Sequence, residues 1–314
     1  MTIALVFPGQ GSQAVGMGKA LADAFIPARQ TFEEVDGALG ERLSDTIWNG
    51  PAEALTLTEN AQPALMTVSI AALRVLEQEA GLDIARDVAF VAGHSLGEYS
   101  ALAAARAISI ADAARLLRIR GRAMQKAVPV GVGAMAALIG LELEEARAIA
   151  AEASDAGVCA AANDNGGGQV VLSGSKPAVE RAVELAKAHG VKRAMMLPVS
   201  APFHCPLMQP AAEVMADALA KVAVDAPLVP VVANVPARPI KEPAEIVQNL
   251  VEQITATVRW RESVLFMEQS GVSSFFEIDA GRVLSGLIKR IAESATATSI
   301  GSPEDVAKFK AARA

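Results

Sequence analysis

Short apolar runs alternate with helical patterns along most of this chain, and that alternation constrains the fold more than any other feature. The apolar run at residues 3–7 precedes helical segments, and a second run at 87–93 precedes a helix that starts near Glu98. Another helix is expected over residues 110–127, ending near Pro129. Strands that alternate with helices form a parallel sheet covered by helices. We therefore predict an α/β fold.

The segment between Pro129 and Pro198 has a different order of elements. Strand, helix, strand, strand, helix and strand follow one another at residues 134–140, 144–153, 158–163, 169–174, 176–190 and 191–199. This β-α-β-β-α-β order is typical of a ferredoxin-like unit. We predict a small ferredoxin-like subdomain over residues 129–198, inserted into a larger, discontinuous subdomain made of residues 1–128 and 199–314.

The chain after the insert returns to the first pattern. Helices are expected near residues 207–222 and 243–256, strands at 229–234 and 273–278, and a closing helix at 282–291. The remaining residues are small and polar, and we expect them to be frayed.

Composition excludes several classes of protein. The chain of 314 residues is 52% hydrophobic and 20% charged, which is typical of a compact globular protein and not of a disordered one. With a net charge of −7 and no long Lys/Arg block, it has no basic stripe for nucleic acid. We expect no membrane span and no signal peptide, because the longest apolar stretch is short and broken by glycine, and the first strand lacks a basic leader. Cys159 and Cys205 suit neither a metal site nor a disulfide framework, so we expect a cytoplasmic protein.

A glycine-rich loop follows the first predicted strand. Residues 9–14, Gly-Gln-Gly-Ser-Gln-Ala, match the G-x-G-x-x-G/A pattern of dinucleotide-binding loops. Such a site also needs a second strand that ends in an acidic residue about 20 positions later. The segment at residues 28–40 has helical spacing instead, which disfavours the dinucleotide interpretation.

A stronger motif lies between the strand at 87–93 and the next helix. Residues 93–97 read Gly-His-Ser-Leu-Gly, the G-x-S-x-G pattern of a nucleophile elbow. The flanking glycines allow a sharp turn, and the turn exposes the Ser95 hydroxyl at a helix N-terminus, where free N–H groups favour a developing oxyanion. The alternative is that Ser95 only caps the helix. We favour Ser95 as the nucleophile.

A serine nucleophile needs a base, and the chain offers three histidines. His94 adjoins Ser95 on the turn, so its side chain should project away from the hydroxyl. His189 ends a surface helix before Gly190, as a C-terminal cap residue does. His204 lies in the loop that returns from the insert and is free to reach the serine. We predict His204 as the base, the alternative being a packed loop residue.

The helix at residues 110–127 contains an arginine that differs from its neighbours. Arg115, Arg118 and Arg122 each have a charged residue three or four positions away, whereas Arg120 has only apolar residues at those offsets. Arg120 should therefore point into the protein, where a guanidinium requires an anion. That anion is either an internal Asp or Glu or a free carboxylate on a substrate, held bidentately.

At these residues the chain resembles the malonyl-CoA:acyl carrier protein transacylase family. The segments "FPGQGSQ", "GHSLGEYSAL", "RIRGRAMQKAVP", "SAPFHCPLM", "LVEQIT", "VRW" and "GRVLSGLIKRI" occur in the family's order across nearly the whole chain. The resemblance implies an α/β hydrolase-like core with an inserted ferredoxin-like subdomain. It places the catalytic pair on Ser95 and His204, and the oxyanion hole on the backbone N–H groups of Gln10 and Leu96.

The same resemblance places the substrate side of the site on Arg120, which would bind the malonyl carboxylate, and on Gln253. It further implies that a main-chain carbonyl near Gln253 orients the histidine in place of a third, acidic residue. Phe203 matches the malonyl-selective form of its loop. Asn163 is a further site candidate of this loop-rich region, and Lys289 with Arg290 is our candidate patch for an acidic carrier protein.

The activity implied is ping-pong transfer of malonyl from malonyl-CoA to the phosphopantetheine thiol of holo-acyl carrier protein through a malonyl-serine. The resemblance implies no tightly bound cofactor and no metal, with the coenzyme A thioester as substrate. Three alternatives share the motifs: a serine thioesterase or hydrolase, a trans-acting polyketide acyltransferase, and a non-catalytic scaffold. Two loops depart from the family pattern, at residues 166–168 (Gly-Gly-Gly) and at 279–281, where Asp279-Ala280-Gly281 replaces a common Gly-Pro-Gly turn.

Overall fold

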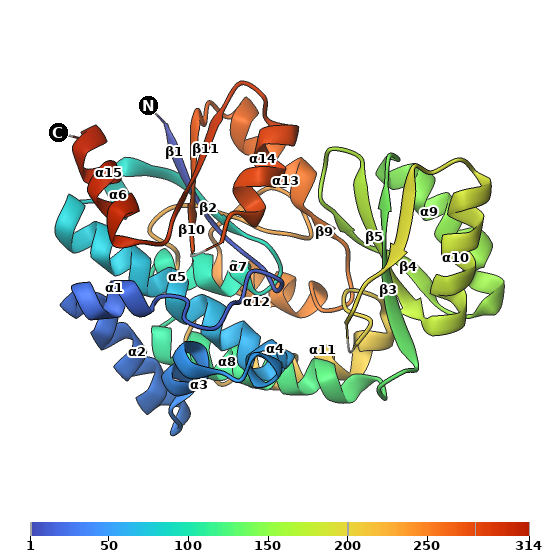
Figure 1. Cartoon of the computed structure of the whole chain (residues 1–314), viewed down its shortest axis with the longest axis horizontal. Helices are drawn as coiled ribbons and strands as arrows, with labels where there is room; N and C mark the ends of the chain where they lie inside the picture. The colour runs from blue at the N-terminus through green and yellow to red at the C-terminus, as the bar shows by residue number, and fades with distance from the viewer. Residues whose placement is uncertain (1, 200, 280, 314) are drawn as a thin grey trace.

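The computed structural model describes residues 2–199, 201–279 and 281–313, and it has the predicted α/β architecture. A large lobe holds a mostly parallel sheet between layers of helices, and a small lobe, green to yellow in Figure 1, lies beside it. Both chain ends lie on the large lobe, on the side away from the small one (Figure 1). Ala280, in one of the two loops that depart from the family pattern, lies outside the described residues.

The larger sheet has the strand order β11-β10-β1-β2-β7-β8. Its strands are β1 (Ile3–Phe7), β2 (Val88–Gly93), β7 (Val231–Val232), β8 (Pro239–Ile240), β10 (Ser274–Ile278) and β11 (Thr296–Ile300). Neighbouring strands pair in parallel from β11 to β7, and β8 adds an antiparallel edge. Because β1 and β2 are parallel neighbours, the loops that follow them leave the same edge of the sheet.

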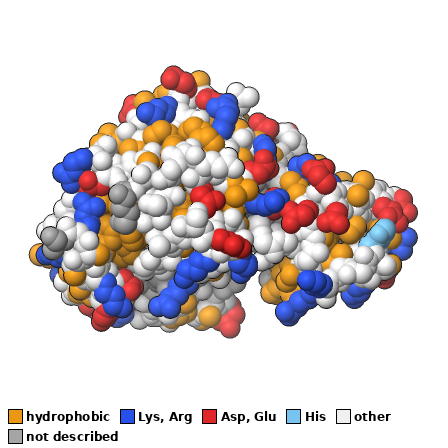
Figure 2. Space-filling view, turned by 90° about the horizontal axis from the view of Figure 1, so that it is seen from above, with side chains coloured by type: hydrophobic (Ala, Val, Ile, Leu, Met, Phe, Trp, Pro, Cys, Tyr) orange, Lys and Arg blue, Asp and Glu red, His pale blue; other side chains and the backbone are white. Residues whose placement is uncertain are grey.

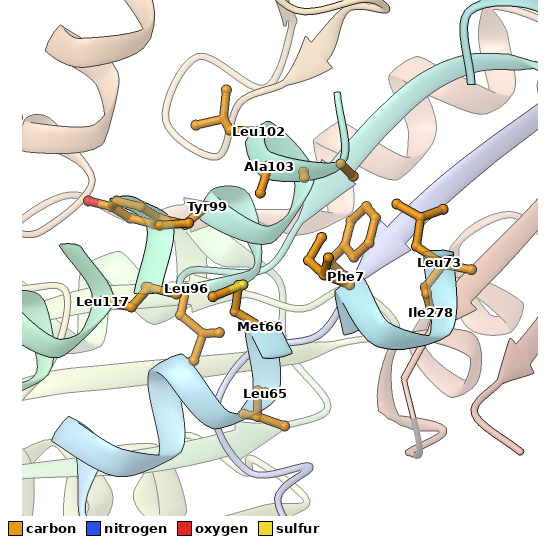
Figure 3. Packing of buried hydrophobic residues seen from close by; sticks show 14 of the residues in the cluster. Phe7, Leu65, Met66, Leu73, Leu96, Tyr99, Leu102, Ala103, Leu117 and Ile278 are labelled. Carbon is orange, nitrogen blue, oxygen red and sulfur yellow. The ribbon is translucent and has the colours of Figure 1, made fainter. Parts of the chain in front are cut away.

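Helices cover both faces of this sheet, because side chains along β1 alternate between two apolar clusters. Leu5 and Phe7 belong to one cluster, and Ala4 and Val6 to the other. Figure 3 shows Phe7 near Met66 on one of the covering helices. The helices of the large lobe are α1 (Lys19–Ala24), α2 (Ile26–Leu39), α3 (Leu43–Asn49), α4 (Ala52–Thr56), α5 (Thr58–Ala80), α6 (Ile84–Asp87), α7 (Gly97–Ala104), α8 (Ile110–Ala127), α11 (Gln209–Leu219), α12 (Pro243–Glu252), α13 (Trp260–Gln269), α14 (Val283–Ile291) and α15 (Pro303–Arg313).

The small lobe contains the predicted β-α-β-β-α-β unit. Its elements are β3 (Gly133–Ile139), α9 (Leu143–Glu152), β4 (Cys159–Asp164), β5 (Gln169–Ser175), α10 (Lys176–Ala188) and β6 (Arg193–Met196), with a 3₁₀ turn η1 (Ala153–Ala156) after α9. The strand order is β6-β3-β5-β4-β9, in which β9 (Val258–Arg259) pairs in parallel with β4. The small sheet therefore takes an edge strand from a segment outside the predicted range 129–198.

The prediction of a frayed C-terminal stretch is wrong. Residues after the closing helix form β11 and α15, and β11 extends the large sheet. Val306 is buried, and the Phe309 ring lies edge-on to Phe276 with 5.0 Å between ring centroids. Arg313 also pairs with Asp87 at 2.6 Å. The polar composition of the segment conceals two apolar side chains at the spacing that one helical face requires.

Two helices of the last third are shorter than predicted. The expected helix at 207–222 is α11, preceded by a 3₁₀ turn η2 (Pro206–Met208), and the expected helix at 243–256 is α12, which ends at Glu252. The predicted strand at 229–234 is reduced to Val231–Val232 in β7. The end of α12 matters below, because the last carbonyls of a helix have no partner within the helix.

The three glycines at residues 166–168 all have left-handed backbone conformations, with φ of +74°, +59° and +70°. A Cβ on Gly166 would lie 2.4 Å from the Ile291 side chain, and one on Gly167 3.1 Å from Arg290. The glycines thus let this loop of the small lobe approach α14 of the large lobe.

The surface carries charges of both signs. Figure 2 shows Lys and Arg side chains interspersed with Asp and Glu over both lobes. Among the helices of the described residues, none combines the length and the apolar character needed to cross a bilayer.

Candidate active site

Ser95 lies in a strained turn between β2 and α7, as the elbow motif predicts. Its φ is +54°, a left-handed conformation that few residues other than glycine adopt. A Cβ on Gly93 would lie 1.9 Å from the Gly97 carbonyl oxygen, and one on Gly97 would lie 2.2 Å from the Phe7 carbonyl oxygen. Both positions therefore require glycine, and the turn presents the Ser95 side chain at the start of α7.

The turn is fixed by Asn234, which follows the neighbouring strand β7. Its Oδ1 accepts from the Ser95 backbone N–H at 2.7 Å, and its Nδ2 donates to the Gly93 carbonyl at 2.6 Å. The Asn234 backbone N–H donates to Oε2 of Glu98 at 3.0 Å. These bonds hold the strained backbone in place, and strained backbone conformations persist only where the surroundings determine them.

His204 contacts the Ser95 hydroxyl directly. Its Nε2 lies 2.7 Å from Ser95 Oγ, and its Nδ1 lies 2.8 Å from the carbonyl oxygen of Gln253. Because a carbonyl can only accept, Nδ1 carries the proton and Nε2 presents its lone pair to the serine hydroxyl. Burial, together with the nearby Arg120 cation, lowers the pKa of His204 to about 3, so the imidazole is neutral near pH 7 and its Nε2 lone pair is unprotonated.

The Gln253 carbonyl takes the place that an acidic residue holds in many serine triads. It belongs to the residue directly after α12, where the helix leaves its last carbonyls unpaired. The negative end of the helix dipole lies at the same point and favours a positive charge on the imidazole during reaction. A neutral dipole stabilises that charge less than a carboxylate would.

The other two histidines lie elsewhere. His94 Nε2 is 2.9 Å from Oδ1 of Asn165, a residue that follows β4 of the small lobe. His189 lies at the end of α10, 3.5 Å from the Glu152 carboxylate. The structure thus brings His204, and neither of the others, into hydrogen-bonding contact with Ser95.

Arg120 points inward from α8, as predicted, and is 1% exposed. Its Nη1 donates to Gln62 Oε1 at 2.8 Å, and its Nη2 donates to Gln253 Oε1 at 2.8 Å and to Ser95 Oγ at 3.1 Å. All these acceptors are neutral, and over the described residues Arg120 forms no ion pair. Burial lowers its pKa from the usual value. The guanidinium therefore has hydrogen-bond donors at the nucleophile but no carboxylate partner of its own.

Glu98 is an acidic residue whose charge acts on Arg120 and opposes the lowering of the guanidinium pKa by burial. It lies in the first turn of α7 and is 1% exposed. Its Oε2 accepts from Gln253 Nε2 at 2.8 Å. Burial raises the pKa of Glu98 to about 7, against the opposing effects of its hydrogen bonds and of Arg120. The internal acid considered for Arg120 is thus separated from it by the Gln253 side chain.

A cavity of about 460 Å³ opens onto these groups, between the two lobes. Ser95, His204 and Arg120 line it from the large lobe, and Asn163 and Val171 from the small one. Phe203 lies on its wall as well. Gln253 is fully buried and does not line the cavity, so its side chain contacts Arg120 from behind.

The glycine-rich loop after β1 borders the same cavity. Gln10 and Leu96 both line it, and a Cβ on Gly9 would lie 2.9 Å from the His94 carbonyl oxygen. Within the described part of the chain, the backbone N–H groups of Gln10 and Leu96 donate to no protein acceptor. Two free donors beside a serine are what an oxyanion hole provides.

Comparison with known proteins gives a consistent result. The sequence profile described as "Acyl transferase domain" matches residues 4–311. The curated malonyl CoA-acyl carrier protein transacylase of Escherichia coli K12 is 47% identical over 304 residues, which cover 97% of each chain. This chain belongs to the acyl transferase family.

Solved structures resemble this acyl transferase closely. The acyl-carrier-protein-S-malonyltransferase of Bartonella henselae is 55% identical, with a TM-score of 0.97, and the match covers 100% of this chain and 99% of that one. A complex of a type II PKS acyl-carrier protein with its malonyl-transacylase contains a chain that is 42% identical, with a TM-score of 0.95 and coverage of 99% and 100%.

Sequence reasoning missed several polar residues around the acyl transferase site: Thr58, Gln62, Glu98 and Asn234. Asn234 ends a predicted strand, and polar residues at that position meet the ends of parallel neighbours, which was a usable signal. Gln62 and Thr58 gave none, because a buried polar residue within a helix cannot be distinguished from an exposed one by type alone. Throughout the described ranges, no group of three or more His, Cys, Asp or Glu side chains is arranged to hold a metal ion.

Proposed function

We propose that this acyl transferase moves a malonyl group from malonyl-CoA to the phosphopantetheine thiol of holo-acyl carrier protein through a malonyl-serine. The observation that carries the proposal is the environment of Ser95 Oγ, which lies 2.7 Å from His204 Nε2 and 3.1 Å from Arg120 Nη2. The nucleophilic oxygen thus contacts both a neutral base and a cation. The printed names of the E. coli relative and of the polyketide complex support malonyl as cargo and a carrier protein as acceptor.

The first half-reaction loads the serine. The malonyl carboxylate accepts from the Arg120 guanidinium and replaces its contact with Ser95. His204 takes the hydroxyl proton at Nε2 as Oγ forms a bond to the thioester carbon, and the carbonyl oxygen becomes an oxyanion at the N–H groups of Gln10 and Leu96. The C–S bond then breaks, and the coenzyme A sulfur leaves with the proton from His204.

The second half-reaction unloads it. The pantetheine thiol gives its proton to His204 and attacks the ester carbonyl through sulfur, again with the oxyanion at the two N–H groups. The bond from carbon to Ser95 Oγ breaks, and Oγ recovers the proton from His204. A thioester is a reactive acyl donor, which suits a base oriented by the neutral Gln253 carbonyl.

The carrier protein is expected to approach near α14. Lys289 and Arg290 are exposed at the end of that helix, and Arg290 Nη2 lies 3.4 Å from Oε1 of Gln169, which lines the cavity. Positive charge at the mouth of the cavity attracts an acidic carrier although the chain as a whole is acidic. We also infer that the enzyme works in the cytoplasm, where its free thiols Cys159 and Cys205 stay reduced.

Intact-mass analysis after mixing with malonyl-CoA tests the proposal. We expect one added malonyl group on the parent protein, mapped to Ser95, none on Ser95→Ala, and release of the group when holo-acyl carrier protein is added. A protein that releases malonate without accumulating the adduct would be a hydrolase, and a protein that is never labelled would overturn the proposal. The rates at which fatty-acid and polyketide carrier proteins remove the malonyl group from the enzyme identify the acceptor.

A further inference from the structure

The side chain of Thr58 forms a hydrogen bond that its own helix does not explain. Thr58 is the first residue of α5 and is 1% exposed, yet no side chain caps this helix. Its Oγ1 instead donates to Oε1 of Gln10 at 2.8 Å, 48 positions earlier in the chain. Gln10 is exposed and belongs to the loop whose backbone N–H borders the cavity. The buried hydroxyl thus holds an exposed loop.

Gln62 connects Thr58 to Arg120, the arginine that faces the substrate in the proposed function. Gln62, one turn further along α5, donates from Nε2 to Thr58 Oγ1 at 2.9 Å, and its Oε1 accepts from Arg120 Nη1 at 2.8 Å. A guanidinium only donates, so Gln62 Oε1 must face Arg120 and Nε2 must face the threonine. The threonine proton is then free for Gln10 alone. Gln62 Nε2 also donates to the Met124 sulfur at 3.8 Å, and the direction of the series from Arg120 to Gln10 is fixed by the arginine.

Another threonine of α5 has the same residue type and burial but a local role. Thr67 is 1% exposed, and its Oγ1 donates to the Pro63 carbonyl at 2.7 Å, four residues earlier in the same helix. That carbonyl bond is the usual way in which a helical threonine satisfies its hydroxyl. Thr58 begins α5 and has no carbonyl of its own helix four residues earlier, so its hydroxyl is available to the Gln10 side chain.

The loop itself needs an external anchor. Gly9 is buried and the Gly16 N–H donates to the Ile47 carbonyl at 2.8 Å, so the loop is held at its two ends, whereas Gly11 between them has φ of +112° and is exposed. Gly11 N–H donates to the Gln13 side chain within the loop, a bond that ties the middle of the loop to no other element. The contact from Thr58 to Gln10 ties the loop to α5, in the rigid large lobe.

We propose that Thr58 is a positioning residue that, through Gln62, ties the oxyanion loop at Gln10 to the arginine that binds the substrate carboxylate. This inference rests on the proposed function. In this proposal, the hydrogen bonds that join Thr58 and Gln62 to Arg120 also fix the position of the Gln10 backbone N–H. Removing the network should therefore slow the chemical step and leave substrate binding unchanged, because Arg120 keeps its Gln253 contact.

Three variants test this in single-turnover acylation with malonyl-CoA, by quenched flow and intact mass. Thr58→Val removes the hydroxyl at similar volume, Thr58→Ser restores it, and Gln10→Ala removes the side-chain acceptor but keeps the backbone N–H. We expect Thr58→Val and Gln10→Ala each to lower the maximal acylation rate about tenfold with the half-saturating malonyl-CoA concentration unchanged, since small misplacements of a catalytic donor are costly. Thr58→Ser should act like the parent.

The double variant Thr58→Val/Gln10→Ala should be no slower than Thr58→Val alone, because both single changes remove the bond between Thr58 and Gln10 and only Thr58→Val also removes the Gln62 contact. Thr67→Val is the matched control: we expect a lower melting temperature and the parent acylation rate. The proposal is overturned if Thr58→Val acylates at the parent rate, or if the two single effects multiply. Should Thr58→Val not fold, Gln10→Ala decides alone, since its side chain is exposed, and a parent rate there overturns the proposal. Failure of the proposed function differs from these outcomes, since the parent protein would then never be labelled.

Discussion

Replacing Arg120 by alanine tests the substrate preference most directly. The guanidinium is buried at the nucleophile and donates to Gln62, Gln253 and Ser95, and over the described residues it forms no ion pair. Arg120→Ala removes the cation that we expect to hold the malonyl carboxylate. It leaves Ser95 and His204 in contact with each other.

The size of the effect follows from the burial of the site. Loss of one partner from a buried, hydrogen-bonded charge pair costs about 2–5 kcal/mol. Since about 1.4 kcal/mol corresponds to a factor of ten, kcat/KM for malonyl-CoA should fall roughly 30- to 5,000-fold. Acetyl-CoA has no carboxylate to lose, so its kcat/KM should stay unchanged or rise. The malonyl-to-acetyl ratio therefore falls by at least the malonyl factor.

The assay measures acyl-enzyme formation with malonyl-CoA and with acetyl-CoA on the same preparation, so that the ratio does not depend on the active fraction. Arg118→Ala is the matched control, because Arg118 is also buried on α8 but pairs with Glu41 and donates to the Glu59 carbonyl at 2.7 Å. This control should lose stability and keep the ratio. An unchanged ratio in Arg120→Ala would refute the assignment of this arginine to the cargo.

Other perturbations give equally specific expectations. Glu98 has its pKa raised from 4.5 to about 7, so the folded state binds a proton that the unfolded state releases, and this group lowers stability as pH rises from 4.5 to 7. The pKa of His204 is lowered from 6.5 to about 3, so this group raises stability as pH rises between those two values. Glu98→Gln removes the opposing effect and should make the melting temperature rise more steeply from pH 5 to 6.5. An unaltered pH profile of the melting temperature contradicts the reasoning. Asn234→Ala leaves the Ser95 N–H and the Gly93 carbonyl unpaired and should lower the free energy of unfolding by about 2–4 kcal/mol in urea titrations. A loss under roughly 0.5 kcal/mol would show that these two bonds do not hold the turn. Lys289→Glu with Arg290→Glu should slow transfer to the carrier protein and leave loading by malonyl-CoA intact in single-turnover measurements; equal slowing of both steps would argue against a docking role.

The features that could be predicted from the sequence are those that depend on residues close to one another along the chain. The elbow at Ser95 follows from two glycines and a strand-helix junction, and the inward direction of Arg120 follows from its apolar neighbours along one helix. The insert is recognisable because its element order differs from that of its surroundings. The contact between His204 and Ser95 could be predicted by elimination among three histidines, which a chain richer in histidine would not have allowed.

The rest depends on contacts between distant segments, which a single sequence does not reveal. Asn234 is 139 positions from Ser95, and Gln253 is 133 positions from Arg120. Arg118 is buried although it has charged helical neighbours, because Glu41 reaches it from the turn between α2 and α3. The C-terminal α15 was missed since only Val306 and Phe309 anchor it, among polar residues.

The edge strand β9 has a consequence for anyone who wishes to exchange the small lobe between enzymes. Four residues separate its first residue from Gln253, whose carbonyl holds His204, and its last residue directly precedes the buried Trp260 of α13. A chimera cut at the two covalent crossings near residues 129 and 198 would import β4 without the strand on which it rests. The transplant must therefore carry a matching version of residues 258–259, because otherwise the imported lobe would displace the Gln253 carbonyl that contacts the His204 imidazole.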